Sequence, residues 1–208
     1  MILIGQYDSP FVRRVGIALT WYGLDFEHRP WSTFGDAEAI AAYNPLRRVP
    51  TLVLDDGMAL TDSLAILEVL DDLVGPEAAV LARRGAERRD MLRIAAFAAG
   101  AADKGVSLVY ERAFREGLPM WVDRCRAQVS DTLNLLDRER ATRGEWLFGD
   151  RPSHADVILA TMFRFVSEAL AGSFDMARWP ALRGHSAKCE ALPQFQAVVQ
   201  PFVLAVPE

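Results

Sequence analysis

The spacing of hydrophobic positions divides the chain into two parts that meet near Gly75-Pro76. In the first part short apolar runs alternate with amphipathic stretches, which predicts strands and helices in turn. The expected order is β-α-β, then one helix, then β-β-α, over residues 2–4, 10–22, 25–29, 36–43, 51–54, 58–60 and 63–73. In the second part apolar residues repeat at helical spacing. We therefore expect an α/β domain over residues 1–75 and an all-helical bundle over residues 86–208.

Turn and capping signals refine this prediction. Residues 55–57 (Asp-Asp-Gly) supply a glycine for a tight hairpin, so the strands on either side should be antiparallel neighbours. In the second part Pro119 marks a helix start, and Ser153 with Asp156 three residues later has the spacing of a capping box.

Composition and charge exclude several classes of protein. The chain has 208 residues, 51% of them hydrophobic, with 23 basic and 28 acidic side chains and a net charge of −5, which excludes a basic nucleic-acid binder. No apolar run approaches the roughly 18 residues that a membrane span requires. Residues 1–5 have no basic region or cleavage site of a signal peptide. We therefore expect a cytoplasmic protein that needs neither membrane nor nucleic acid.

Cysteine and histidine are too scattered to build a metal site. Cys125 and Cys189 lie 64 residues apart in helical patterns and are expected to be buried packing residues. The three histidines are equally dispersed. No metal cofactor is therefore expected.

The first candidate for chemistry is Ser9, in the stretch Ser-Pro-Phe-Val-Arg-Arg of residues 9–14. Ser9 suits the N-cap of the first helix, and Pro10 suits the first helical position. An ordinary cap explains this pattern in isolation, but a hydroxyl can accept from the helix backbone and still donate its proton. An anion such as a thiolate would be stabilised there by the positive end of the helix.

Basic residues and a proline mark the second candidate stretch, Asn-Pro-Leu-Arg-Arg-Val-Pro of residues 44–50. Four of the five basic residues in residues 1–74 are Arg13, Arg14, Arg47 and Arg48, which an anionic ligand would explain. A cis bond at Val49-Pro50 would turn the Val49 N–H and C=O towards an extended peptide, although trans is the default.

The third candidate stretch opens the helix after the hairpin. Asp62 or Ser63 can simply cap this helix. Exposed N–H groups and a hydroxyl at a helix start also suit a ligand carboxylate, and an adjacent aspartate suits an ammonium group. Together they would recognise an α-amino acid head group.

Five stretches, taken in their order along the chain, resemble the serine-type classes of the glutathione S-transferase superfamily. They are residues 9–14, 44–50, 62–67, 146–149 (Trp-Leu-Phe-Gly) and 152–156 (Pro-Ser-His-Ala-Asp). The resemblance spans nearly the whole chain. It implies a thioredoxin-like N-terminal domain that binds glutathione as co-substrate and a helical C-terminal domain that completes a pocket for a small hydrophobic electrophile. Members of this superfamily are usually dimers, so the resemblance also implies a homodimer. The 21 arginines against 2 lysines indicate a GC-rich bacterial genome.

The resemblance also implies roles for individual residues. Ser9 corresponds to the catalytic serine, with Tyr7 as the rival donor to the thiol. The residues that would contact glutathione are Phe11, Arg48, Val49, Pro50, Asp62 and Ser63. Those that would line the electrophile pocket are Phe11, Phe34, Asp103, Val106 and Tyr110. Ser153 and Asp156 match a capping box of the family and carry only a structural role. Serine in place of cysteine at position 9 argues against mixed-disulfide chemistry.

Two functions follow from these expectations. The first is an enzyme that activates the glutathione thiol for conjugation to an electrophile. Lowering a thiol pKa from about 8.5 by about two units requires about 2.7 kcal/mol, which one charge-assisted hydrogen bond and a helix N-terminus can supply. The alternative is a binding or interaction module that keeps the fold without catalysis.

Overall fold

The computed structural model describes residues 1–80 and 85–204, which form two compact units. Unit 1 comprises residues 1–80 and 193–204, and unit 2 comprises residues 85–192. The division differs from the expected one, because residues 193–204 pack with unit 1 and not with the helical bundle. Arg13, which is buried in unit 1, donates hydrogen bonds to the carbonyl oxygens of Phe195 and Val198 in this segment.

Unit 1 contains a four-stranded mixed sheet with the strand order β2-β1-β3-β4. Its strands are β1 (Ile2–Ile4), β2 (Glu27–Arg29), β3 (Thr51–Val53) and β4 (Ala59–Thr61). Strand β1 is parallel to β2 and antiparallel to β3, and β3 is antiparallel to β4. The predicted hairpin is therefore confirmed, with Gly57 at a φ of 87° in its turn. Strand β1 has the predicted bounds, and the ends of the other three strands differ from the predicted ones by at most two residues.

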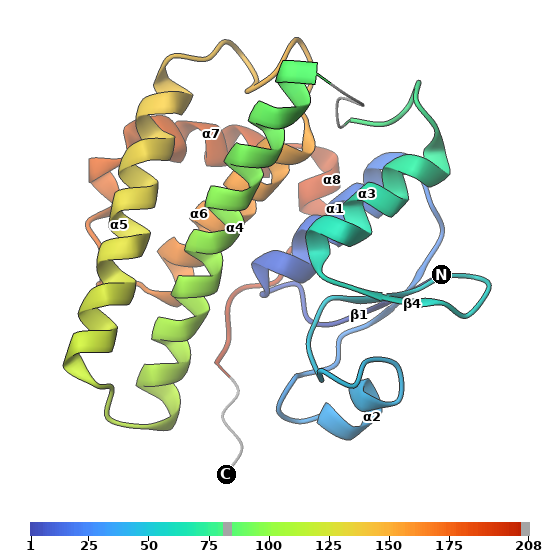
Figure 1. The fold of residues 1–208 in the computed structure, drawn as a ribbon, viewed down its shortest axis with the longest axis horizontal. Helices are drawn as coiled ribbons and strands as arrows, with labels where there is room; N and C mark the ends of the chain where they lie inside the picture. The colour runs from blue at the N-terminus through green and yellow to red at the C-terminus, as the bar shows by residue number, and fades with distance from the viewer. Residues whose placement is uncertain (81–84, 205–208) are drawn as a thin grey trace. The chain divides into compact units, whose positions relative to one another are not determined.

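Helices cover both faces of this sheet (Figure 1). They are α1 (Pro10–Tyr22), α2 (Ala37–Ala41), α3 (Ser63–Val74) and the short α8 (Pro193–Gln196). Figure 1 shows α1 and α3 on one face and α2 on the other. Ile4 and Val53 pack with Ile40 of α2. Because side chains alternate along a strand, the fully buried Leu3 and Leu52 face the side of α1 and α3.

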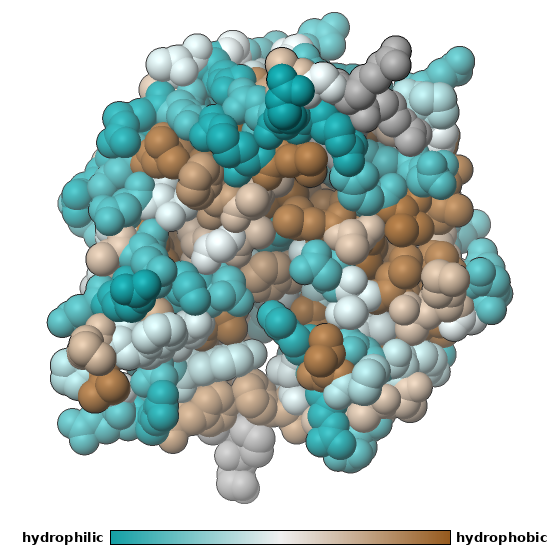
Figure 2. Space-filling model, in the orientation of Figure 1, coloured by the Kyte–Doolittle hydropathy of each residue, from teal (hydrophilic) through white to brown (hydrophobic). Residues whose placement is uncertain are grey.

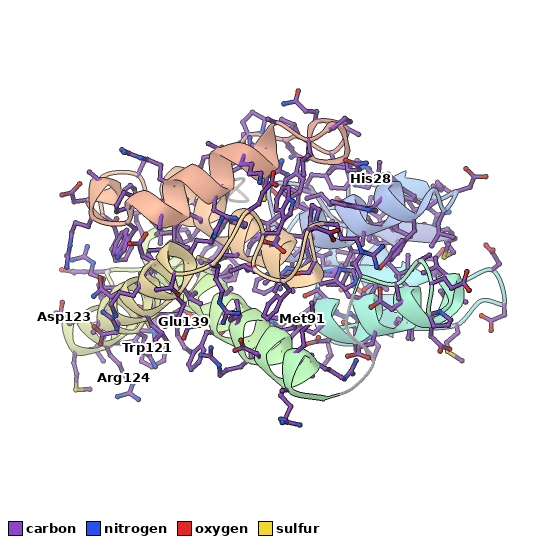
Figure 3. The ribbon with its side chains drawn as sticks, turned by 90° about the horizontal axis from the view of Figure 1, so that it is seen from above. His28, Met91, Trp121, Asp123, Arg124 and Glu139 are labelled. Atoms are coloured by element: carbon purple, nitrogen blue, oxygen red, sulfur yellow. The ribbon has the colours of Figure 1, made fainter. Side chains whose placement is uncertain are left out.

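Unit 2 is all-helical, as the spacing predicted. Its helices are α4 (Gly85–Phe114), α5 (Pro119–Ala141), α6 (His154–Ala169), η1 (Met176–Arg178) and α7 (Pro180–Glu190). Helix α6 is buried on almost all sides and is the core helix of the bundle. The Arg93 Nη2 atom of α4 and the Glu139 Oε2 atom of α5 form an ion pair at 2.6 Å, and Figure 3 labels Glu139.

The capping box predicted at Ser153 and Asp156 is present at the start of α6. The fully buried Asp156 carboxylate accepts hydrogen bonds from the Ser153 N–H (2.8 Å) and from the Leu147 N–H (2.9 Å). It therefore fixes the preceding loop as well as the helix end.

Cys189 and Cys125 are buried, as expected for packing residues. Within residues 1–80 and 85–204, no helix is long and apolar enough to cross a membrane. In the same part of the chain, no group of three or more His, Cys, Asp or Glu side chains could hold a metal ion.

The buried His185 leads us to expect that acid destabilises unit 2. Burial lowers the pKa of His185 and outweighs the opposite effect of the Asp156 carboxylate. Arg140, which donates to the His185 Nδ1 atom at 3.0 Å, also lowers this pKa. The charged or titratable groups that face His185 are Asp156, Arg140, Lys188 and Cys189. The unfolded chain takes up a proton near pH 6.5 that the folded chain takes up only at lower pH.

We therefore expect the free energy of unfolding to fall as the pH is lowered from about 7 to 5, by up to about 1.4 kcal/mol per pH unit. A His185→Gln variant should lose this part of the pH dependence. Urea unfolding at several pH values measures it, and an unchanged slope in the variant would contradict the assignment to His185.

Candidate active site

Ser9 lies at the N-cap of α1, half-buried and followed by Pro10 in the first turn. Its Oγ atom accepts the Val12 N–H at 3.4 Å, a long hydrogen bond. No described residue accepts the proton of the Ser9 hydroxyl. The hydroxyl can therefore donate to an anion placed at the positive end of the helix.

Tyr7, the rival donor, is held by packing. Its ring stacks on His28, which Figure 3 labels, with 3.9 Å between the ring centroids and 13° between the planes. The ring also lies against Gly16 of α1, where an added Cβ would come within 2.7 Å of the Tyr7 Cε1 atom. Burial raises the pKa of Tyr7 to about 12, which makes its hydroxyl a weaker acid than usual. These observations favour Ser9 over Tyr7 as the donor.

Val49 lies beside the first turn of α1. A Cβ on Gly5 would come within 2.5 Å of the Val12 Cγ2 atom and 2.7 Å of the Val49 Cβ atom, so glycine permits this approach. The Val49-Pro50 bond is cis. Neither the N–H nor the C=O of Val49 makes a hydrogen bond with a described residue, so both can pair with an extended peptide.

Asn44 connects the second and third candidate stretches. This residue is buried, and its Nδ2 atom lies within hydrogen-bond distance of the Arg48 carbonyl oxygen (3.1 Å) and the hydroxyls of Thr51 (3.0 Å) and Thr61 (3.1 Å). The amide therefore fixes the segment before Val49 and the residue before Asp62 at the same time. Asn44 belongs to the motif of residues 44–50, but the sequence pattern alone does not indicate this role.

Asp62 has a left-handed backbone conformation, with a φ of 68°. Its Oδ1 atom accepts the N–H groups of Leu64 (2.8 Å) and Ala65 (3.3 Å) and so caps α3. Such a conformation costs about 1–3 kcal/mol in a residue other than glycine and is common at functional sites. The carboxylate is exposed, and the neighbouring Ser63 is buried at the first position of α3.

Arg14 is a further residue of this region whose individual role the sequence does not predict. Its side chain is fully buried, and its Nε atom donates to the Pro10 carbonyl oxygen at 3.0 Å. The guanidinium carbon lies 4.8 Å from the centroid of the Phe11 ring. The Nη1 and Nη2 atoms are buried without a hydrogen-bond partner among the described residues. The clustering of arginines in the sequence was the only signal for it.

The charge of Arg14 is poorly compensated. Burial lowers the pKa of its guanidinium to about 9, and the Asp62 carboxylate acts in the opposite direction. An unpaired buried charge is costly, and the charge that acts on the Arg14 guanidinium is the Asp62 carboxylate at the start of α3.

The structure thus groups the predicted glutathione contacts in unit 1. Arg48 is exposed, and its side chain makes no hydrogen bond with a described residue. The residues predicted to line the electrophile pocket are divided between the units. Phe11 and Phe34 belong to unit 1, whereas Asp103, Val106 and Tyr110 lie three and four residues apart along α4 and share a face of that helix. The electrophile pocket stays a prediction.

Comparison with known proteins gives consistent matches along the chain. Residues 3–78 match the family model "Glutathione S-transferase, N-terminal domain", and residues 119–188 match "Glutathione S-transferase, C-terminal domain". The maleylacetoacetate isomerase of Pseudomonas aeruginosa is 30% identical over 211 residues, which cover 94% of each chain. The uncharacterized GST-like protein YibF of Escherichia coli is 34% identical over 143 residues, which are 69% of this chain and 65% of YibF.

Solved structures agree with these matches. A glutathione S-transferase from Methylobacterium radiotolerans in complex with glutathione sulfonate superposes with a TM-score of 0.91, at 28% identity, over 100% of this chain and 97% of that one. A glutathione S-transferase from Methylobacillus flagellatus with glutathione bound gives a TM-score of 0.85, at 25% identity, over 95% and 98% of the two chains. The sheet, the helical unit and both family models lead to one conclusion, that the chain belongs to the glutathione S-transferase superfamily.

Proposed function

We propose that this protein binds glutathione in unit 1 and stabilises its thiolate for attack on a small electrophile. The observation that carries the proposal is the Ser9 hydroxyl, whose proton has no acceptor among the described residues and which stands at the start of α1. Family membership and the similar structures solved with glutathione sulfonate or glutathione support the choice of ligand.

Three groups of contacts would hold the tripeptide. The α-carboxylate of the γ-glutamyl group meets the Arg14 guanidinium and Ser63 at the start of α3, and its ammonium group meets Asp62. The cysteinyl backbone pairs with the N–H and C=O of Val49. Arg48, exposed and near this segment, meets the glycyl carboxylate.

Ser9 then acts on the cysteinyl sulfur. The hydroxyl donates a hydrogen bond that is stronger to the thiolate than to the thiol, so the equilibrium shifts towards the anion and the proton leaves to solvent. This bond contributes about 1.5–3 kcal/mol and the helix N-terminus about 0.3–1 kcal/mol, enough to lower the thiol pKa by about two units. No general base is required.

The thiolate supplies the electron pair of the new S–C bond. In a displacement the leaving group departs with the electrons of its own bond to carbon. In an addition the electrons of the double bond move to the activating group, and solvent returns a proton.

A second candidate is glutathione-dependent isomerisation, because a relative that matches over 94% of this chain is a maleylacetoacetate isomerase. There the same thiolate would add to an activated cis double bond, the resulting single bond would rotate, and elimination would restore the thiolate. An assay separates the two: conjugation consumes one glutathione per product, whereas isomerisation consumes none.

Further parts of the proposal concern the electrophile and the assembly. Phe11, Phe34, Asp103, Val106 and Tyr110 would contact a small hydrophobic electrophile, and the protein would work as a homodimer in the cytoplasm. Exposed apolar side chains on α3 (Leu73) and on α4 (Leu92, Phe97) support the homodimer. Figure 2 shows hydrophobic side chains at the surface over both helices. A protein that binds glutathione without accelerating any reaction would instead be the non-catalytic module.

Substitutions at positions 7 and 9 test the thiol activator. In Ser9→Ala the thiol pKa of bound glutathione should rise by about one to two units, and kcat/KM at pH 7 should fall about 10- to 100-fold. Ser9→Thr retains the hydroxyl and should remain close to wild type. Tyr7→Phe retains the stacked ring and should leave the thiol pKa unchanged. The thiolate absorbance of the complex, titrated with pH, gives these values, and a shift in Tyr7→Phe alone would reassign the role to Tyr7.

Two variants separate the charge of Asp62 from its capping function. Asp62→Asn retains a capping oxygen and tolerates the left-handed backbone, so the free energy of unfolding should change by less than about 0.5 kcal/mol, while glutathione affinity should fall about tenfold. Asp62→Ala should lose affinity and about 1–2 kcal/mol of stability. Calorimetric titration and urea unfolding measure both quantities. Wild-type affinity in Asp62→Asn would show that the carboxylate does not bind the ammonium group.

Replacement of Arg14 by methionine should weaken glutathione binding and leave the free protein at least as stable as wild type. The reason is that an apolar side chain of similar length removes an uncompensated buried charge. Affinity should fall about 10- to 100-fold. An analogue without the α-carboxylate should bind wild type and Arg14→Met equally, which makes it the matched control. If the analogue also discriminates between them, Arg14 does not bind this carboxylate.

A further inference from the structure

Residues 193–204, here called the C-terminal strap, contact the loop of residues 5–9, which lies between β1 and α1 and includes Ser9. The Tyr7 N–H donates to the Gln200 Oε1 atom at 3.0 Å across 193 positions of sequence. The Val203 N–H lies 3.5 Å from the Asp8 Oδ2 atom. The strap therefore touches both residues that precede Ser9.

Arg13 fixes the strap to the first turns of α1. Its side chain is 3% exposed, and it donates to the Val198 carbonyl oxygen at 3.0 Å and to the Phe195 carbonyl oxygen at 3.2 Å. Its guanidinium carbon also lies 5.6 Å from the centroid of the buried Phe195 ring. Because Arg13 of α1 fixes the backbone of the strap, the position of Gln200 relative to the loop is fixed as well.

We propose that Gln200 is a positioning residue, whose side-chain oxygen holds the Tyr7 amide and thereby aligns the Ser9 hydroxyl with the sulfur of bound glutathione. This inference rests on the proposed function. Gln200 touches neither glutathione nor the reacting atoms in it, and acts through the loop backbone.

The geometry of the loop makes this contact important. Within the loop, the Ser9 N–H donates to the Gln6 carbonyl oxygen at 3.2 Å, and the Tyr7 ring stacks on His28. Neither contact engages the Tyr7 N–H. A hydrogen bond weakens steeply as its length and angle depart from the optimum, so a small displacement of Ser9 reduces its preference for the thiolate. The residues proposed to bind the two ends of glutathione do not belong to this loop.

Three variants test the inference. Gln200→Met removes the acceptor at similar length, and Gln200→Glu keeps an acceptor oxygen. Gln194→Met is the matched control, because Gln194 belongs to the same strap and its side chain makes no hydrogen bond with a described residue. For each variant the measurements are the thiol pKa in the complex, the Kd of glutathione, kcat, KM and hydrogen exchange at the Tyr7 amide, with circular dichroism to confirm folding.

In Gln200→Met the thiol pKa should move about 0.5–1 unit towards that of the free thiol, and kcat at pH 6.5 should fall about three- to tenfold. The Kd and KM for glutathione should stay within about twofold, while the Tyr7 amide should exchange about tenfold faster, as expected for the loss of one hydrogen bond. Gln200→Glu and Gln194→Met should match wild type in all of these.

Several results would overturn the inference. One is a wild-type thiol pKa in Gln200→Met despite faster Tyr7 exchange, and another is an equal loss in Gln200→Glu or in Gln194→Met. Ser9→Ala is measured together with the Gln200 and Gln194 variants. It separates failure of the inference about Gln200 from failure of the proposed function. If wild type lowers the thiol pKa and Ser9→Ala does not, only the role of Gln200 fails. If wild type itself leaves the thiol pKa unchanged, both fail.

Discussion

Two adjacent arginines buried in α1 determine how unit 1 is organised. A buried guanidinium is costly unless its N–H groups are hydrogen-bonded. Arg13 meets this requirement inside the protein, through the Phe195 and Val198 carbonyl oxygens, and so holds the end of the chain against α1. Arg14 does not meet it, since two of its nitrogens have no partner among the described residues. One arginine thus holds the end of the chain, whereas the charge of its neighbour stays poorly compensated.

The rest of the candidate site is arranged around the same helix. Gly5 lets Val49 approach the first turn of α1, and the Asn44 amide fixes the segments that lead to Val49 and Asp62. The donors and charges proposed to bind glutathione therefore lie on segments that the fold already holds. Preorganisation of this kind lowers the entropy that binding and reaction would otherwise cost.

The sequence predicted what depends on local pattern, and missed what depends on distant contacts. Hydrophobic spacing predicted the strands and helices, Gly57 the hairpin, and Ser153 with Asp156 the capping box. The strap could not be predicted to join unit 1, because Arg13 and Val198 are 185 positions apart. Burial of Arg14 could not be predicted either, since arginine is mostly exposed in proteins.

The most direct test of the central claim counts the protons released when glutathione binds. Calorimetric titration at pH 7 in buffers of different ionisation enthalpy gives this number for the wild-type protein. If the thiol pKa falls from about 8.5 to about 6.5, about 0.7 proton should be released per glutathione bound. Binding without proton release would show that glutathione stays a thiol in the complex, which would contradict the account.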